Sequence, residues 1–144
     1  MPKYAQGRFV VKNKDKYLGN REPIYRSSWE FTFMKFCDEH PSIVKWISEG
    51  IKIPYRNPFT GKYTVYVPDF LISYVDANGK QKTELIEVKP AAQRSLQEAK
   101  KNKRNAAHAI LNAAKWEAAQ AYCRQNNITF RVVTENDIFH NGKG

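Results

Sequence analysis

The stretch that decides the fold is Leu85-Ile86-Glu87-Val88-Lys89, the end of a predicted strand over residues 83–89. Side chains alternate between the two faces of a strand, so Ile86 and Val88 share one face while Glu87 and Lys89 share the other. Apolar residues such as Ile86 and Val88 are typical of a strand inside a sheet. The stretch therefore predicts a core strand that carries a carboxylate and an ammonium group on one side.

A second acidic residue, Asp69, lies in a predicted strand over residues 63–74 that Pro68 interrupts. It follows Val65 and Val67 at strand spacing and precedes Leu71, so we expect it to point with these apolar side chains. A charge stands here where the pattern expects an apolar residue. Asp69 is therefore a second candidate for a buried carboxylate.

A third acidic residue, Glu30, lies in a predicted helix that begins at Ser27 or Ser28 and ends near Glu39, before Pro41. It shares one helix face with three apolar residues at spacings of three, four and seven. These are Phe33, Met34 and Cys37. The helix therefore directs a carboxylate towards the core.

Converging carboxylates raise one another's pKa unless a cation lies among them, and Mg²⁺ prefers such oxygen ligands. We expect Asp69, Glu87 and the backbone carbonyl of Val88 to hold Mg²⁺, with Mn²⁺ able to substitute. Lys89 would orient or help deprotonate the attacking water and stabilise charge in the transition state. Glu30 would act from the helix, through a water or a second metal. The constellation suits phosphodiester hydrolysis.

Each of these residues also has a purely structural interpretation. Glu30 stands at the third helical position of a capping box that Ser27 begins. Asp69 is compatible with a turn, and Glu87 and Lys89 with an exposed strand pair. Because all three structural interpretations would have to hold together, we favour the catalytic one.

The remaining pattern predicts an α/β (α+β) fold in the order helix, three strands, long helix, strand. We expect a helical turn after Pro41, with Ile43 and Trp46 turned inward, and an alanine-rich helix after residues 91–105. The predicted strands cover residues 51–55, 63–74, 83–89 and 128–133. The chain divides into a basic N-terminal arm over 1–26 and a single domain over 27–144.

The 144 residues include 24 Lys or Arg against 14 Asp or Glu, a net charge of +10 that predicts a polyanionic partner, double-stranded DNA first. Two segments carry the excess: residues 1–26 and 91–124 each hold seven basic and two acidic residues. Lys115 either reaches a phosphate or extends to solvent beside an apolar stripe. The candidate DNA-binding residues are Arg26, Lys100, Lys101, Lys103, Arg104 and Lys115.

No apolar run is long enough to span a membrane, and no secretory stretch opens the chain, so we expect an intracellular protein without a membrane partner. Cys37 and Cys123 lie far apart, without the spacing of a disulfide framework or a zinc site. The oligomeric state stays open.

Pro68-Asp69 and Glu87-Val88-Lys89 match the PD-(D/E)xK signature of restriction-endonuclease-like nucleases. Over about residues 22–136 the chain resembles the head-completion nuclease of contractile-tailed phages. The flanking stretches that carry this resemblance are Tyr25 to Glu30, Ile53-Pro54-Tyr55, Val67 to Phe70, Ile86 to Pro90, Lys115 to Gln120 and Phe130 to Glu135.

The resemblance implies a three-layer αβββαβ core with a mixed central sheet. It also implies catalytic roles for Glu30, Asp69, Glu87 and Lys89, with Mg²⁺. The function would be trimming or cutting of packaged DNA so that filled heads join tails, in the host cytoplasm or on the virion, with phage head or neck proteins as partners. Holliday-junction resolvases and transposon-end endonucleases share the motif and stay open, as does a non-catalytic DNA-binding or virion-joining protein.

Overall fold

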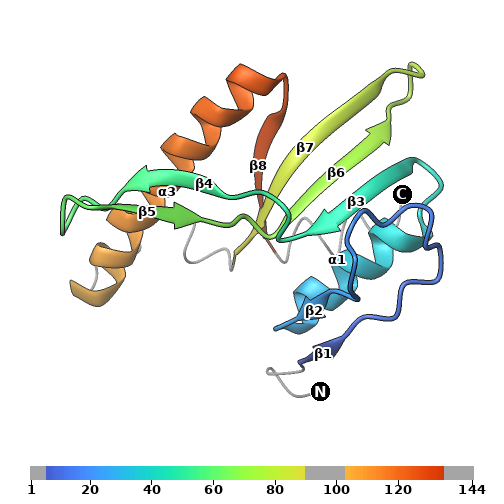
Figure 1. The fold of residues 1–144 in the computed structure, drawn as a ribbon, viewed down its shortest axis with the longest axis horizontal. Helices are drawn as coiled ribbons and strands as arrows, with labels where there is room; N and C mark the ends of the chain where they lie inside the picture. The colour runs from blue at the N-terminus through green and yellow to red at the C-terminus, as the bar shows by residue number, and fades with distance from the viewer. Residues whose placement is uncertain (1–5, 90–102, 135–144) are drawn as a thin grey trace.

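The computed structural model describes residues 6–89 and 103–134 (Figure 1). Its helices are α1 (Ser28–Glu39) and α3 (Lys103–Asn126). Its strands are β1 (Gly7–Arg8), β2 (Ile24–Tyr25), β3 (Ile43–Ser48), β4 (Ile53–Arg56), β5 (Tyr63–Tyr66), β6 (Phe70–Val75), β7 (Gln81–Val88) and β8 (Thr129–Val133).

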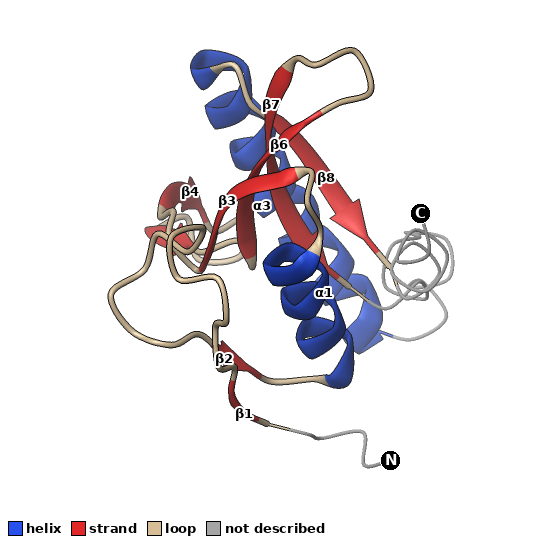
Figure 2. Ribbon diagram, turned by 90° about the vertical axis from the view of Figure 1, so that its right-hand side faces the viewer, coloured by secondary structure: helices blue, strands red, loops and turns tan. Residues whose placement is uncertain are grey.

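A four-stranded sheet in the order β3-β6-β7-β8 forms the centre of the molecule. Strands β3, β6 and β7 pair antiparallel, whereas β8 pairs parallel to β7 after the crossover through α3, so the sheet is mixed. The core of the described residues consists of two hydrophobic clusters, one against α1 and one against α3. Ile86 packs in the first cluster, and the adjacent Leu85 packs in the second. Because neighbouring residues of β7 face opposite cores, the helices lie on opposite faces, as Figures 1 and 2 show. The predicted three-layer αβββαβ fold is confirmed.

The predicted helical turn after Pro41 is wrong, because this segment is strand β3. Ile43 and Trp46 are buried as expected, although a regular strand turns residues three apart to opposite faces. The register of β3 against β6 shifts between Ile43 and Lys45, which marks a β-bulge. The extra residue brings both side chains to the core face, and their spacing therefore imitates that of a helix.

The predicted long strand over 63–74 is two strands in different sheets. Strand β5 pairs with β4 in a separate two-stranded sheet, and β6 joins the central sheet. Val65 is 51% exposed on β5, so Asp69 does not share a buried face with it as we expected. The three strands of the αβββαβ order are therefore β3, β6 and β7, and β4 and β5 form an additional hairpin.

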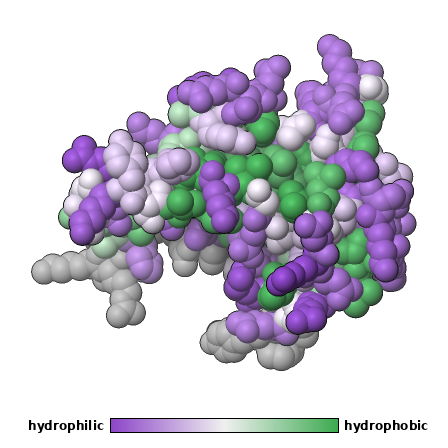
Figure 3. Space-filling model, in the orientation of Figure 1, coloured by the Kyte–Doolittle hydropathy of each residue, from purple (hydrophilic) through white to green (hydrophobic). Residues whose placement is uncertain are grey.

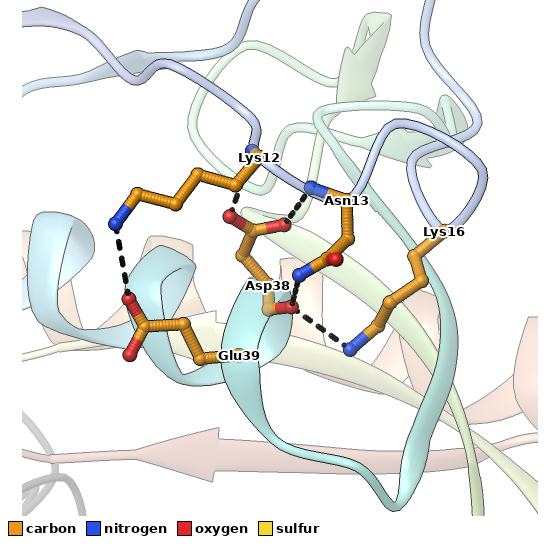
Figure 4. A network of polar contacts seen from close by, with 5 residues as sticks. All are labelled: Lys12, Asn13, Lys16, Asp38 and Glu39. Atoms are coloured by element: carbon orange, nitrogen blue, oxygen red, sulfur yellow. Dashed lines mark hydrogen bonds and ion pairs between the residues drawn. The ribbon is translucent and has the colours of Figure 1, made fainter.

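The basic segment over 6–26 packs along the body of the protein. Phe9 and Val11 are buried in the same cluster as the apolar face of α1. The carboxylate of Asp38, near the end of α1, accepts hydrogen bonds from the backbone N–H groups of Lys12 and Asn13 at 2.9 and 3.0 Å. Figure 4 shows this network, in which the ammonium of Lys16 also reaches the Asp38 carbonyl. A division between an arm over 1–26 and a domain over 27–144 stays a prediction.

Neither described helix combines the length and the apolar character that a membrane span requires.

Candidate active site

Asp69 lies directly before β6, at the point where the β6–β7 ladder ends. The last pair of that ladder is Phe70 with Ile86. Beyond it, the carboxylate oxygen Oδ2 of Asp69 accepts the Val88 N–H at 2.8 Å. The N–H and C=O of one strand residue point to the same side, so the Val88 carbonyl faces the side on which Asp69 lies. The end of the ladder thus brings together a carboxylate and a backbone carbonyl.

Glu87, the neighbour of Val88 on β7, is 6% exposed, and both of its carboxylate oxygens have partners. The hydroxyl of Tyr66 donates to Oε1 at 2.8 Å, and the ammonium of Lys89 lies 3.3 Å from Oε2. Glu87 and Lys89 therefore share one side of the strand, as their spacing predicts. The contact with Tyr66 fixes the orientation of the Glu87 side chain.

The surroundings of Asp69 disfavour its ionised form. Burial, followed by the negative charge of Glu87, raises its pKa to about 8, and the charge of Glu30 adds to this effect. The hydrogen bond from Val88 and the charge of Lys89 lower the pKa of Asp69. The other three predicted site residues, Glu30, Glu87 and Lys89, thus lie within electrostatic reach of Asp69, although the catalytic roles of all four stay predictions.

Glu30 shows one half of the expected capping box, because its carboxylate accepts the N–H of Arg26 and not that of the N-cap Ser27 as we expected. Ser27 is the N-cap of α1, and its hydroxyl accepts the Glu30 N–H at 3.1 Å. The Glu30 carboxylate accepts the N–H of Arg26, one residue before the cap, at 3.3 Å. Burial raises the pKa of Glu30, while Arg26 lowers it. Glu30 is therefore a cap that also contributes negative charge to the site.

Arg26 is a predicted DNA-binding residue, and its guanidinium forms an ion pair with Glu49 at 2.6 Å. Glu49 follows β3 with a positive φ of 54°, and its N–H donates to the backbone carbonyl of Asp69 at 2.9 Å. A non-glycine residue in this left-handed region is uncommon. Glu49 thus connects Arg26 to the backbone of the site, a contact that local sequence patterns do not reveal.

The other predicted DNA-binding residues fall in and around α3. Lys100 and Lys101 lie outside the described residues, and Lys103 and Arg104 begin α3 without described side chains. The ammonium of Lys115 lies 5.8 Å from the centre of the Tyr66 ring. Burial and the charge of Lys89 lower the pKa of Lys115. Lys115 therefore lies beside the candidate site.

The donors at the site suit a hard divalent cation. Within the described part of the chain, no three His, Cys, Asp or Glu side chains form a group that could hold a metal ion. The available ligands are instead the carboxylates of Asp69 and Glu87 with the Val88 carbonyl, all oxygen donors of the kind Mg²⁺ binds alongside water. The raised pKa of Asp69 reflects a concentration of negative charge that a cation would offset. The donor set fits Mg²⁺ or Mn²⁺.

Tyr66 is the functional candidate that sequence reasoning missed. It is 4% exposed and contacts Glu87 from β5, a strand of another sheet. Its position three residues before Asp69 gives no local signal, because the contact depends on how the hairpin packs against the end of β7. Tyr66 is a positioning residue for Glu87.

Comparisons with known proteins relate this chain to nucleases. The family described as TnsA-like endonuclease N terminal matches residues 40–135, which include Asp69, Glu87 and Lys89. The head completion nuclease of Enterobacteria phage T4 is 34% identical over 142 residues, an alignment that covers 92% of this chain and 92% of that protein. The family match leaves out Glu30 and Arg26, which precede residue 40, whereas the similarity to the T4 protein covers most of the chain.

Proposed function

The chain belongs to the head completion nuclease family and carries a TnsA-like endonuclease domain, and from this membership we propose that it is a metal-dependent endonuclease that cuts double-stranded DNA during phage head completion. The observation that carries the proposal is the group of Asp69, Glu87 and Lys89 at the end of the β6–β7 ladder. This group contains the acidic and basic residues of the PD-(D/E)xK signature.

In this proposal Asp69, Glu87 and the Val88 carbonyl hold a divalent cation. Such a cation supplies Lewis-acid stabilisation of the phosphate charge and increases the acidity of water. Its charge also offsets the repulsion between the two carboxylates, which the raised pKa of Asp69 reflects. Tyr66 keeps Glu87 in the orientation that this role needs, through its 2.8 Å hydrogen bond.

The other charged side chains act on water and on the transition state. The Lys89 ammonium, 3.3 Å from Glu87, orients the attacking water and stabilises the negative charge that develops on the phosphate. Glu30 holds water on the helix side of the site, where it also caps α1. Arg26, which pairs with Glu49, and Lys115, which lies beside Tyr66, bind DNA phosphates near the site.

We further propose that the enzyme acts in the host cytoplasm or on the virion, where phage head or neck proteins are its partners. The name of the T4 relative supports this place in assembly. The match to TnsA-like endonucleases favours one alternative substrate, a transposon end, which a linear duplex with a transposon-end sequence distinguishes from a linear duplex without one. Branched against linear DNA separates a Holliday-junction resolvase from a head-completion nuclease.

The test is cleavage of supercoiled and linear DNA in a Mg²⁺ titration, with excess EDTA as the metal-free condition. We expect cleavage by the wild type to require Mg²⁺ or Mn²⁺, and Asp69→Ala and Glu87→Gln to abolish it while the protein stays folded. The control Asp15→Asn removes an exposed acid and should cut at the wild-type rate. Cleavage in EDTA would refute the metal requirement, and full activity of either site variant would refute the assignment.

A further inference from the structure

The β4–β5 hairpin is a two-stranded sheet that does not join the central sheet. Its inner face carries Ile53, Tyr55 and Tyr66, which are buried in one cluster with Ala119 and Cys123 of α3. In Figure 1 the hairpin crosses α3, and its turn lies at the left end of the molecule. The inner face is therefore part of the core, and the outer face has no role in it.

The outer face is unusually rich in exposed apolar and aromatic groups. Pro54 pairs with Val65 and Arg56 pairs with Tyr63, and strand alternation turns all four away from α3. Tyr63 is 77% exposed and Val65 51%, and Phe59 in the turn is 58% exposed. A surface of this kind marks a binding site more often than a solvated face.

The charge on the hairpin is of one sign. From residue 50 to residue 68 the sequence contains no Asp or Glu and three basic residues, Lys52, Arg56 and Lys62, which are all exposed. In Figure 3, hydrophilic and less polar side chains are mixed at the left end of the molecule, where Figure 1 places the hairpin turn. Basic and aromatic groups without acids complement a nucleic acid better than a protein surface.

The hairpin is also joined directly to the candidate site. Tyr66, at its inner end, donates to Glu87 at 2.8 Å, and a short connection then leads the chain to Asp69. Strand β5, from Tyr66 back to Tyr63, extends over roughly 10 Å, and the turn lies beyond it. The major groove of a duplex, roughly 12 Å wide, admits a two-stranded ribbon. DNA with a phosphate at the site thus lies within reach of the hairpin.

We propose that the hairpin, residues 52–66, binds duplex DNA on one side of the cleaved phosphate. Lys52, Arg56 and Lys62 contact backbone phosphates, and Phe59 and Tyr63 pack against sugars and base edges in the groove. The inference deepens the proposed function and rests on it, since it assigns the substrate surface of the same site.

The first test is the salt dependence of DNA binding, measured by fluorescence anisotropy with a short labelled duplex in EDTA. The double variant Lys52→Gln/Lys62→Gln removes two hairpin charges and leaves Arg56, which donates to the Gly61 carbonyl within the turn. The matched control Lys35→Gln/Lys80→Gln removes two exposed charges elsewhere. We expect the hairpin variant to flatten the log–log slope by about 0.9 for each phosphate that it no longer binds. Equal slopes for the two doubles would overturn the proposal.

The second test concerns the aromatic groups. Phe59→Ala and Tyr63→Ala together should weaken duplex binding by roughly tenfold at constant salt, because neither alanine can pack against a sugar or base. The melting temperature of this double variant should stay near that of the wild type, since both side chains are exposed. The control Val75→Ala removes an exposed apolar side chain at the end of β6 and should bind as the wild type does. Unchanged binding by the aromatic double would assign the surface to another partner.

Cleavage assays of the same variants in Mg²⁺ separate the two hypotheses. If the wild type binds DNA but does not cut it, the proposed function fails while the hairpin result stands. If the wild type cuts DNA and the lysine double keeps the wild-type salt slope, the hairpin inference alone fails. A loss of cleavage by the hairpin double that high DNA concentration restores would support both.

Discussion

Asp69 is the residue that links the acid–base chemistry of the site to the stability of the protein. The folded state retains a proton up to about pH 8, whereas an unfolded Asp releases it near pH 3.8. Between these values the folded state binds more protons than the unfolded state, so this residue makes stability fall as the pH rises. A bound cation would reverse the preference, because it favours the ionised carboxylate.

We therefore expect the metal-free protein to lose thermal stability between about pH 5 and pH 8, and Asp69→Asn to remove much of that loss. The measurement is the melting temperature in EDTA across this range. Asp15→Asn, at an exposed position, should retain the wild-type slope. If wild type and Asp69→Asn depend on pH in the same way, Asp69 is ionised in the folded protein.

Glu30 is either a catalytic residue or only a helix cap, and one substitution distinguishes the two roles. Glu30→Gln keeps a hydrogen-bonding side chain at the third position of the capping box and removes the charge near Asp69. We expect turnover to fall by roughly a hundredfold with little change in melting temperature. Glu30→Ala should also lower stability by about 1 kcal/mol. Near-normal cleavage by Glu30→Gln would leave Glu30 as a cap alone.

Lys89 is assigned to the transition state, and its variants should show that in their kinetics. Lys89→Ala should reduce turnover far more than DNA affinity, because the ammonium acts on charge that develops during reaction. Lys89→Arg should restore little, since a planar guanidinium does not replace a compact ammonium beside Glu87. Equal losses in turnover and affinity would indicate a role in DNA binding instead.

At the scale of elements, the buried side chain of Asp38 helps to attach the end of α1 to the preceding chain. Asp38 is 1% exposed and accepts two backbone N–H groups. Asp38→Ala would leave both donors without their acceptor, and we expect a loss of about 2–4 kcal/mol in unfolding free energy. The neighbouring Glu39→Ala is the control, since its exposed 4.0 Å contact with Lys12 should contribute less than about 0.5 kcal/mol. Urea denaturation of both variants measures the difference.

The elements also show which parts of the structure the sequence can predict. The helix α1 was predictable because its cap and its apolar spacing are local. Strand β3 was not, because the bulge after Ile43 replaces strand spacing with helix spacing. The split between β5 and β6 was visible as Pro68, but the partners of each strand are set by tertiary pairing.

The same distinction applies to the candidate site. Asp69, Glu87 and Lys89 could be singled out because each places a charge in an apolar pattern. Tyr66 could not, since its contact with Glu87 joins strands of different sheets. The candidate catalytic residues can thus be predicted from local sequence patterns. The residue that positions one of them is identified only once the tertiary contacts are known.

At the scale of the whole molecule, basic charge is expected to determine how tightly DNA is held. Neutralising Lys100, Lys101, Lys103 and Arg104 together should flatten the salt dependence of DNA affinity by up to about 0.9 for each phosphate that is no longer bound. Cleavage at saturating DNA should keep its wild-type rate, because these residues lie outside the proposed chemistry. Binding across a salt series and single-turnover cleavage provide the two measurements. An unchanged slope would assign these charges to solvation or to a protein partner.

The segment before α1 has a consequence for how the protein behaves at high concentration. Strand β3 is an edge of the central sheet, and edge strands offer free N–H and C=O groups to other chains. Here Leu18 donates to the Trp46 carbonyl, and Trp46 donates to the Lys16 carbonyl, both at 3.0 Å. These two hydrogen bonds use the backbone groups of Trp46, in the middle of edge strand β3, and they place Lys16 beside that strand. The N-terminal segment therefore protects the edge of the sheet from aggregation. A truncation that removes this segment would expose β3 to strand pairing between molecules.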